Sequence, residues 1–475
     1  MTFNTLSYFF FLPASYLAFY LTADRWRWLV LLLASYGFYA CLKAPYLLAV
    51  LFAVTTISYC VGLKIAQVEP ESLKRRWLFG GCLACIGTLA AVKCLPLLAT
   101  RGGTSGTLIS VGVSYFSFQA VSYLADIYLE IEEPERDFGR FALYLAFFPK
   151  LLQGPIERGG DLLPQLKKPY RFDYDTARSG LVLFGGGLFK KVVVADWLGL
   201  YADQVYNNVH DYTGVSLLVA TYAYALQIYF DFSSYTDMAR GTARLFGIEL
   251  TENFNAPYRA TSVAEFWRRW HISFSRWILD YIFKPLQLSW RHAGQLGSAL
   301  ALVVTFLISG LWHGVGWTFV IWGLLHGSYL AASNYYRPYQ KRLYQWLGVA
   351  RSPWLSWWKI FVTFHLVSFA WVFFRANTLS DALYVARNLF DLGGSLSAYL
   401  TLGSKPFYRD LVLMGVGENK TYLQLLCIAL VLALKKAGQE TRSQPALRWV
   451  YYLATALACL NFGIPNINKF IYMQF

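Results

Sequence analysis

Charged side chains are scarce in this sequence: they make up 15% of its 475 residues, against about 25% in soluble domains. Hydrophobic residues make up 56%. A chain of this composition cannot cover a folded surface with polar groups, which excludes an ordinary water-soluble protein. Long hydrophilic stretches are missing too, because the largest pieces between hydrophobic runs are only residues 154–179, 251–295 and 375–420. We therefore expect one domain over residues 1–475.

Several familiar catalytic signatures are also missing. Gly185-Gly186-Gly187 precedes Lys190 and Lys191 but lacks the Walker spacing of a phosphate-binding loop, and the sequence has no GxSxG elbow. The seven cysteines lie in or beside hydrophobic runs, and Cys82 and Cys85 form a CxxC pair without a second pair or ligating histidines. Packing is the favoured role for the cysteines, and we expect neither a metal site nor a tightly bound cofactor.

Hydrophobic runs fill most of the chain instead. Several approach the length of about 20 residues that crosses a bilayer core, and others are shorter. The stronger runs cover residues 5–21, 45–63, 77–99, 107–129, 297–312, 317–333 and 356–374, and the weaker runs cover 28–41, 141–153, 181–200, 215–232, 421–435 and 449–463. The sequence predicts an all-α polytopic membrane protein with about ten to twelve membrane helices and some re-entrant pieces.

The net charge of +15 comes from basic residues that lie between these runs. They cluster at Arg25 and Arg27, Lys74 to Arg76, Lys167 to Arg171, Lys190 and Lys191, Arg337 to Arg342, and Lys435 to Arg448. This is the positive-inside pattern of a membrane protein, and it argues against nucleic acid as a partner. Counting spans from these clusters predicts that the N-terminus and Phe475 lie outside the cytoplasm. The same count puts the acidic loop Glu130–Asp137 on the cytoplasmic side.

The segment from Asp231 to Trp290 is unusual for a membrane protein because it is dense in aromatic, cationic and carboxylate side chains. Aromatic residues recur there at helical spacing, at Phe266, Trp270, Phe274, Trp277 and Tyr281, with Arg268, Arg269 and Arg276 on the opposite face. The spacing predicts one amphipathic helix at the membrane surface or dipping into the protein. A plain surface anchor with snorkelling arginines is the alternative, and the presence of His271 favours a functional role.

Only six histidines are present, and His313 is the strongest candidate for chemistry. It lies in Ser309-Gly310-Leu311-Trp312-His313-Gly314, between two hydrophobic runs, where glycines permit close backbone approach and Trp312 can exclude water. A histidine pKa of about 6.5 suits a general base that deprotonates a hydroxyl during attack on a thioester. The alternative is a turn histidine that only caps a helix end.

The remaining histidines are weaker candidates. His326 follows closely enough in the sequence to line the same cavity as His313. His365 lies in a hydrophobic run, where an interhelical hydrogen bond is its favoured role. His210 and His292 fall in predicted loops and are expected to be solvated.

A second polar group, Tyr229 to Met238, follows the hydrophobic run 215–232 and contains Asp231 and Asp237. Carboxylates near hydrocarbon need hydrogen-bonding or charged partners. Structural bracing by arginines or backbone amides is therefore the favoured role of both.

Five stretches of this sequence resemble the membrane-bound O-acyltransferase (MBOAT) family, in particular its bacterial branch of alginate O-acetylation and teichoic acid D-alanylation membrane proteins. They are Val111 to Tyr115 with Tyr123 to Tyr128, Tyr229 to Met238, Glu252-Asn253-Phe254-Asn255-Ala256-Pro257-Tyr258, Glu265-Phe266-Trp267-Arg268-Arg269-Trp270-His271-Ile272-Ser273, and Gly310-Leu311-Trp312-His313-Gly314. These stretches extend over most of the chain in the expected order, and the RRWHIS and GLWHG pair is the most specific.

The resemblance implies a ring of membrane helices around a thin central region with a tunnel between the two faces. It implies that His313 is the essential catalytic residue and that His271 is a second functional histidine. Candidates for the tunnel wall and substrate contact are Trp312, Asn255, Arg268, Arg269, Trp270, His326 and Asp231. The donor implied is a cytoplasmic thioester, acetyl-CoA or an acyl-carrier thioester, from which only the acyl group crosses.

The sequence ends in Phe470-Ile471-Tyr472-Met473-Gln474-Phe475, which resembles the FxYxxF ending of the small partner in the D-alanylation system. The resemblance implies that Tyr472 accepts the acyl group, with His313 as base, and passes it on. A phenol with a pKa of about 10 is a better leaving group than an alcohol, so onward transfer to a hydroxyl is downhill. An aromatic anchor at the membrane interface is the alternative.

Nothing outside the predicted membrane region is large enough to hold a polysaccharide. We therefore expect a separate extracytoplasmic, SGNH-hydrolase-like transferase as partner, a polysaccharide as final acceptor, and a location among the lipids of a bacterial inner membrane. Two alternatives stay open: D-alanyl transfer to teichoic acid, and a polytopic transporter or flippase whose intramembrane histidines and arginines line a path.

Overall fold

The computed structural model describes residues 1–42, 44–99, 112–391, 393–394, 397, 400–401, 418–440, 445–463 and 470–471. Within these ranges the chain is helical, and its one β-type pairing is an isolated bridge between Phe254 and Trp270. The predicted all-α class is confirmed. Four of the described helices are long and apolar enough to cross a membrane: Pro45–Gln67, Val215–Leu245, Arg291–His313 and Pro353–Arg375.

The described residues form two compact units. The first unit contains Met1–Leu188, Tyr235–Glu252 and the C-terminal residues Phe470 and Ile471. The second contains Phe189–Ser234 and the described residues from Asn253 to Gly463. One helix, Val215–Leu245, belongs to both units, and a single domain over residues 1–475 stays a prediction.

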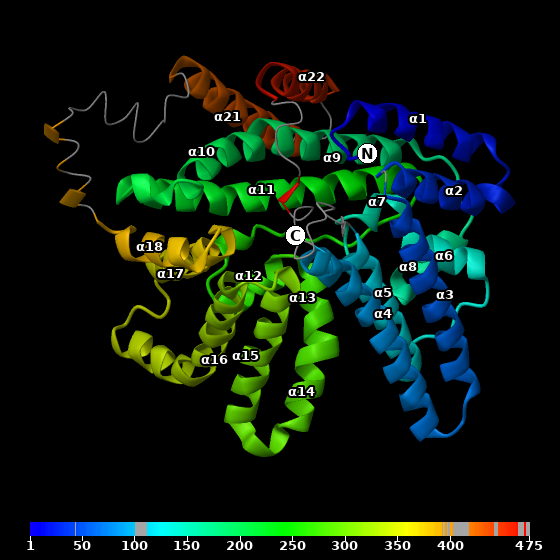
Figure 1. Ribbon diagram of the computed structural model, residues 1–475. Coiled ribbons are helices and arrows are strands. Elements are labelled where there is room, and N and C mark those ends of the chain that lie inside the picture. The colour runs from blue at the N-terminus through cyan, green and yellow to red at the C-terminus, as the bar shows by residue number, and fades with distance from the viewer. Residues whose placement is uncertain are drawn as a thin grey trace. The chain divides into compact units, whose positions relative to one another are not determined.

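The first unit is built around three long helices that pack side by side, α3, α4 and α5 (Figure 1). Its helices are α1 Leu6–Leu21, η1 Asp24–Trp26, α2 Arg27–Ala40, α3 Pro45–Gln67, α4 Glu71–Ala99, α5 Val113–Tyr128, α6 Phe138–Ala146, α7 Phe148–Leu151, α8 Gly159–Lys167 and α9 Tyr174–Phe189. Small residues bring the three long helices together, because Gly62 of α3 lies against the Tyr123 ring of α5 and Gly81 of α4 lies against Val61 of α3.

The hydrophobic run at residues 141–153 does not form a membrane crossing. It folds into α6 and the one-turn helix α7, which are separated at Phe147 and are each far shorter than the roughly 20 residues that a crossing needs. From Phe141 to Leu151 the side chains of both helices are buried, so the apolar ones serve the core of the first unit.

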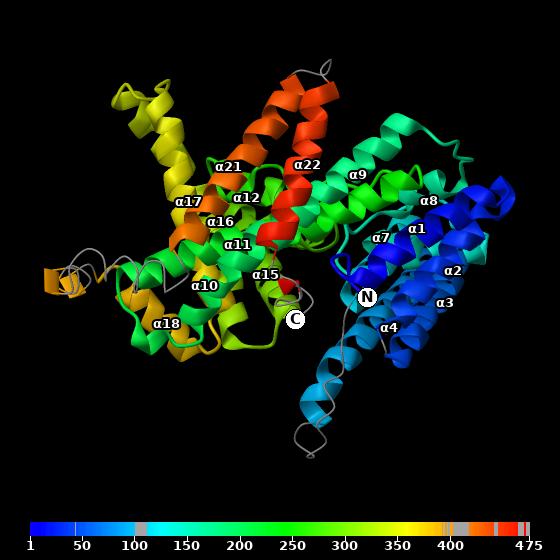
Figure 2. The same cartoon turned by 90° about the horizontal axis from the view of Figure 1, so that it is seen from above.

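The second unit carries the stretches on which the chemistry was predicted. Its helices are η3 Lys190–Ala195, α10 Asp196–Tyr206, η4 Val209–Asp211, α11 Val215–Leu245, η5 Pro257–Arg259, α12 Val263–Arg269, α13 Ile272–Ile278, η6 Leu279–Phe283, α14 Lys284–Ser289, η7 Arg291–Ala293, α15 Gly294–His313, α16 Trp317–Trp346, α17 Pro353–Arg375, α18 Leu379–Asn388, α21 Glu418–Glu440 and α22 Pro445–Phe462. In Figure 1, α15 and α16 run side by side as a hairpin, and Figure 2 shows α21 and α22 paired in the same way.

Glycines allow the α15–α16 hairpin to pack at backbone contact. A Cβ on Gly323 of α16 would meet the Phe306 carbonyl oxygen of α15, and one on Gly327 would lie 2.8 Å from the Cα of Val303. Gly323 and Gly327 are four residues apart and therefore lie on one face of α16, as in the GxxxG pattern of closely packed membrane helices.

The prediction of one amphipathic helix through residues 266–281 is wrong. The chain breaks between α12 and α13, where His271 has a left-handed backbone with φ of +43°. Of the two predicted placements, at the membrane surface or dipping into the protein, the structure shows the second for Phe266, Trp270 and Phe274, which are all buried. The pattern identified which side chains face inward but not the turn between them.

Candidate active site

The break at His271 is held by pairing with the preceding Asn253–Ala256 stretch. The Asn255 amide donates to the Arg269 carbonyl at 3.0 Å, and the Ile272 amide donates to the Asn253 carbonyl at 3.0 Å. These two bonds flank the isolated bridge between Phe254 and Trp270. The ENFNAPY and RRWHIS stretches are therefore one structural element.

A side chain completes this element. The Asn253 amide oxygen accepts a hydrogen bond from the Ser273 amide at 3.0 Å, at the start of α13. The His271 carbonyl accepts from the Ser275 amide at 2.8 Å. Left-handed geometry is costly for a residue with a Cβ, and it persists where the surroundings determine it. Here several hydrogen bonds determine it, and they set the direction of the His271 side chain.

The His271 ring lies inside an aromatic layer and is only 1% exposed. It stacks on Phe274 with ring centroids 5.0 Å apart, and it meets the edge of Phe232 of α11 at 4.7 Å. Burial lowers the pKa of His271 to about 3, because the charged imidazolium would lose its hydration. His271 is therefore a neutral imidazole at physiological pH, suited to hydrogen bonding and unsuited to holding a positive charge.

His313 is the last residue of α15 and is buried. Its ring lies 4.4 Å from Trp312, 5.1 Å from Trp322 of α16 and 5.0 Å from Phe374 of α17, measured between centroids. The helix end is fixed by Gly310, where an added Cβ would meet the Phe319 carbonyl oxygen. His313 is thus placed by a regular hairpin, with aromatic rings that exclude water around it.

Stacked rings connect the two histidines. Phe274, which stacks on His271, also stacks on Trp312 at a centroid distance of 4.5 Å, and Trp312 is the neighbour of His313. On the other side, Trp322 lies between His313 and His326, whose centroid it approaches to 5.0 Å. We call this set, His271, Phe274, Trp312, His313, Trp322 and His326, the histidine cluster.

The proton on His326 can be assigned from a neighbour. The Trp267 indole N–H donates to His326 Nδ1 at 3.2 Å, and an indole nitrogen can only donate. The neutral ring therefore carries its proton on Nε2. His326 Nε2, Trp322 Nε1 and Ser309 Oγ are buried and have no hydrogen-bond partner among the described residues. Such donors, beside His313, suit a polar group of a substrate.

The other predicted wall residues have different surroundings. Trp270 is buried and packs on Phe266 and on Trp371 of α17. Arg269 forms an ion pair with Glu265 at 2.7 Å and donates to the Asn255 carbonyl at 3.3 Å, which makes it a brace of the broken segment.

Arg268 and Asn255 are exposed, unlike the residues of the histidine cluster. Tyr472 lies outside the described residues. The residues directly before it, Phe470 and Ile471, belong to the first unit and are buried, and Phe470 meets Tyr235 edge to face at 5.2 Å.

Asp231 has a partner that the sequence did not suggest. Its carboxylate lies 2.6 Å from Lys191 Nζ, and Asp196 lies 2.8 Å from the same nitrogen. All three side chains are almost fully buried. Lys191, counted above with the charges between hydrophobic runs, is therefore an internal counter-ion, and its place in the run 181–200 was the available signal. Lys191 supplies a charged partner for Asp231 where arginines or backbone amides were predicted.

The chain is similar to known proteins along its length. The sequence profile of the MBOAT, membrane-bound O-acyltransferase, family matches residues 134–375, a range that contains His271, His313 and His326. The Helicobacter pylori protein named peptidoglycan O-acetyltransferase is 33% identical over an alignment that covers 100% of this chain and 96% of that protein. The Pseudomonas aeruginosa protein named probable alginate O-acetylase AlgI is 36% identical, over 81% of this chain and 74% of its own length. The Bacillus subtilis teichoic acid D-alanyltransferase is 27% identical, over 56% of this chain and 69% of its own length.

Proposed function

Because this chain belongs to the membrane-bound O-acyltransferase family, we propose that it moves an acetyl group across a bacterial inner membrane for O-acetylation of a cell-surface polysaccharide. The chain is a membrane O-acyltransferase. The donor is a cytoplasmic thioester, acetyl-CoA or an acyl-carrier thioester, and the acceptor side is outside. The observation that carries this proposal is the joining of His271 and His313 in one buried aromatic cluster, inside the range that matches the family.

Acetyl is favoured over D-alanyl as the group transferred. Relatives named for O-acetylation share 33% to 36% identity over at least 81% of this chain. The two named for D-alanyl transfer share 27% and 25% over 56% and 62% of it. Transfer of D-alanine to teichoic acid remains the second candidate function.

His313 acts as the general base in this mechanism. A ring nitrogen of His313 takes the proton of the attacking hydroxyl, and the oxygen forms a bond to the thioester carbonyl carbon. The C–S bond then breaks, and the thiolate leaves with the proton that His313 has held. The ester formed and the free thiol balance the hydroxyl and thioester consumed. Trp312, Trp322 and Phe374 support this step because they keep water from the thioester.

His271 has a different role, since burial keeps it neutral. A neutral imidazole can donate a hydrogen bond to the thioester carbonyl oxygen as negative charge develops there. The strained backbone and the hydrogen bonds of Asn253 fix its ring, so donation would need little reorganisation.

Tyr472 is the hydroxyl that first accepts the acetyl group. The resemblance of residues 470–475 to the FxYxxF ending supports this relay. The acetyl-tyrosine ester then passes its acyl group to an extracytoplasmic, SGNH-hydrolase-like transferase, which delivers it to the polysaccharide. Both chain ends lie on the outer side in this scheme.

The test is mild-base release of ester-linked acids from surface polymers of cells with matched protein levels. Wild type should release acetate, whereas His313→Ala and Tyr472→Phe should release only background. Exposed His292→Ala and half-buried Tyr452→Phe are matched controls and should behave as wild type. Release of D-alanine would favour the second candidate function. If the Tyr472→Phe variant releases as much acetate as wild type, the acyl-tyrosine relay is wrong. If the His313→Ala variant does so, the assignment of His313 as general base is wrong.

A further inference from the structure

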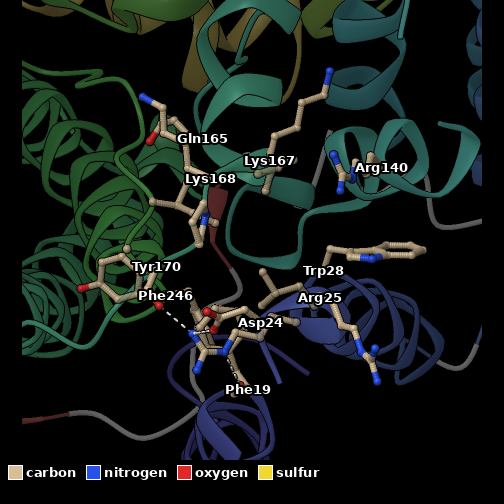
Figure 3. A pocket seen from close by; sticks show the side chains of 16 residues that line it. Phe19, Asp24, Arg25, Trp28, Arg140, Gln165, Lys167, Lys168, Tyr170 and Phe246 are labelled. Carbon is tan, nitrogen blue, oxygen red and sulfur yellow. Dashed lines mark hydrogen bonds and ion pairs between the residues drawn. The ribbon is translucent and has the colours of Figure 1, made fainter. Parts of the chain in front are cut away.

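A pocket of about 460 Å³ lies in the first unit, among residues that belong to none of the five family-like stretches (Figure 3). Its walls come from the end of α1, from η1 and the start of α2, from α6, from the chain around the end of α8, and from the turn after α11. Figure 3 shows Arg25 and Trp28 of the N-terminal segment around the same space as Arg140, Lys167 and Lys168.

The pocket is strongly basic. Its lining holds five cationic side chains and one carboxylate: Arg25, Arg27, Arg140, Lys167 and Lys168, with Asp24. Two of the cations are committed to the fold. Arg27 pairs with Asp24 at 2.5 Å and donates to the Tyr170 carbonyl at 2.6 Å, while Lys167 pairs with Glu135 at 2.6 Å.

Arg25 and Lys168 differ from those two cations. Both are exposed, and neither forms an ion pair with any of the described residues. Arg140 is intermediate, since its guanidinium is 3.6 Å from Asp137. The lining therefore carries more positive charge than its own carboxylates neutralise, in a concave space where the charges reinforce one another.

Close packing of Tyr170 on Gly247 fixes part of the pocket wall. Gly247 has φ of +74°, and a Cβ there would overlap the Tyr170 ring, so the ring rests directly on the glycine backbone. Arg27 donates a hydrogen bond to the Tyr170 carbonyl. A ligand would therefore meet a largely pre-formed site.

Exposed apolar and aromatic side chains surround the pocket. Leu21 and Trp26, next to its lining residues, are 84% and 49% exposed, and Phe172 is 55% exposed. Exposed aromatic side chains beside basic ones are typical of the bilayer interface. The helices α6 and α7, between Arg140 and Lys168, are too short to cross a membrane, so both residues lie on the same side as Arg25 in the pocket lining. The positive-inside pattern assigns this side to the cytoplasm.

We propose that this pocket binds the phosphate of an anionic ligand at the cytoplasmic membrane surface, with Arg25 and Lys168 as the residues that contact it. Two sources share this chemistry: the headgroup of an anionic phospholipid, which the exposed apolar residues around the pocket favour, and the phosphates of a soluble coenzyme. Arginine and lysine side chains are the usual protein partners of both.

The test is binding to purified full-length protein, measured with short-chain phosphatidylglycerol, short-chain phosphatidylcholine and coenzyme A as separate probes. For the true source, Arg25→Gln combined with Lys168→Gln should weaken binding by about 30-fold, from two charges near a phosphate. Arg75→Gln combined with Arg76→Gln is the matched control, because it removes two exposed charges elsewhere in the same unit. The control should bind as wild type does.

If the Arg25→Gln, Lys168→Gln variant binds only phosphatidylglycerol more weakly than wild type, the pocket is a lipid site. If it binds only coenzyme A more weakly, the pocket is a coenzyme site. Equal losses in the two double variants, or no loss with any probe, would overturn the proposal. The His313→Ala protein should bind each probe as wild type does. The proposal of a phosphate site is therefore tested independently of the acyl-transfer mechanism.

Discussion

The two histidines of the cluster are placed by opposite means. His271 stands at a left-handed break between two short helices, and its position depends on hydrogen bonds from the Asn253 stretch. His313 stands at the end of a regular helix, and its position depends on glycines that let α15 and α16 touch. One site is strained locally and the other is packed closely. The difference suggests a fixed hydrogen-bonding residue at 271 and a residue that exchanges protons at 313.

The largest effect is expected from replacing His313 with glutamine, and the same replacement at His271 tests whether the two histidines have different roles. Glutamine keeps a hydrogen-bonding amide but cannot take a proton at neutral pH. His313→Gln should therefore reduce acetate release by at least about 100-fold, the lower range for loss of a general base. His271→Gln should retain much more activity, within about 10-fold of wild type, since its amide can still donate. Mild-base acetate release at matched protein levels measures both.

Equal losses in the two variants would contradict this division of roles. So would a larger loss at 271 than at 313, which would exchange the two assignments. Exposed His292→Gln is the control for a histidine substitution outside the cluster.

The second expected effect tests the close packing that places His313. Gly323→Ala puts a Cβ against the Phe306 carbonyl of α15, so the hairpin must open. Overpacking of this kind typically costs about 1–3 kcal/mol, and the thermal midpoint of the purified protein should fall. Gly37→Ala in α2 is the control, because nothing lies within 4 Å of its added Cβ. Helix propensity alone should then raise the midpoint slightly. A fall of equal size in both variants would show that the contact is unimportant.

Some of this arrangement followed from the sequence. Apolar content predicts an all-α membrane protein, and the spacing of Phe266, Trp270 and Phe274 predicts that these side chains share one apolar face, because helical periodicity places them together. The Gly310-Leu311-Trp312-His313-Gly314 motif likewise predicts a histidine beside closely packed backbone. These features depend on neighbours in the sequence.

Features set by distant contacts did not follow. The aromatic spacing continues through His271 without interruption, yet the helix ends there, because pairing between Phe254 and Trp270 overrides the local preference. Lys191 looked like a loop charge, since its carboxylate partner Asp231 lies 40 residues away. The shared pocket of Arg25 and Lys168 also depends on contacts between residues far apart in the sequence. The run 141–153 was expected to cross the membrane, but it folds into short helices that keep Arg140 and Lys168 at the same pocket.

The smallest expected effect uses pH to sharpen the contrast at His271. Its pKa is lowered to about 3 in the folded protein, against about 6.5 when exposed, so the folded state binds fewer protons below pH 6.5. The stability that depends on the neutral ring is fully present above pH 6.5 and declines as the pH falls toward 3. Between pH 7.5 and pH 5 the free energy of unfolding of the wild type should fall by about 2 kcal/mol more than that of His271→Gln, which has no titrating group at this position. Thermal melts of both proteins at pH 7.5 and 5 give this difference directly, and identical pH dependence would mean that His271 is hydrated and able to act as a charged acid.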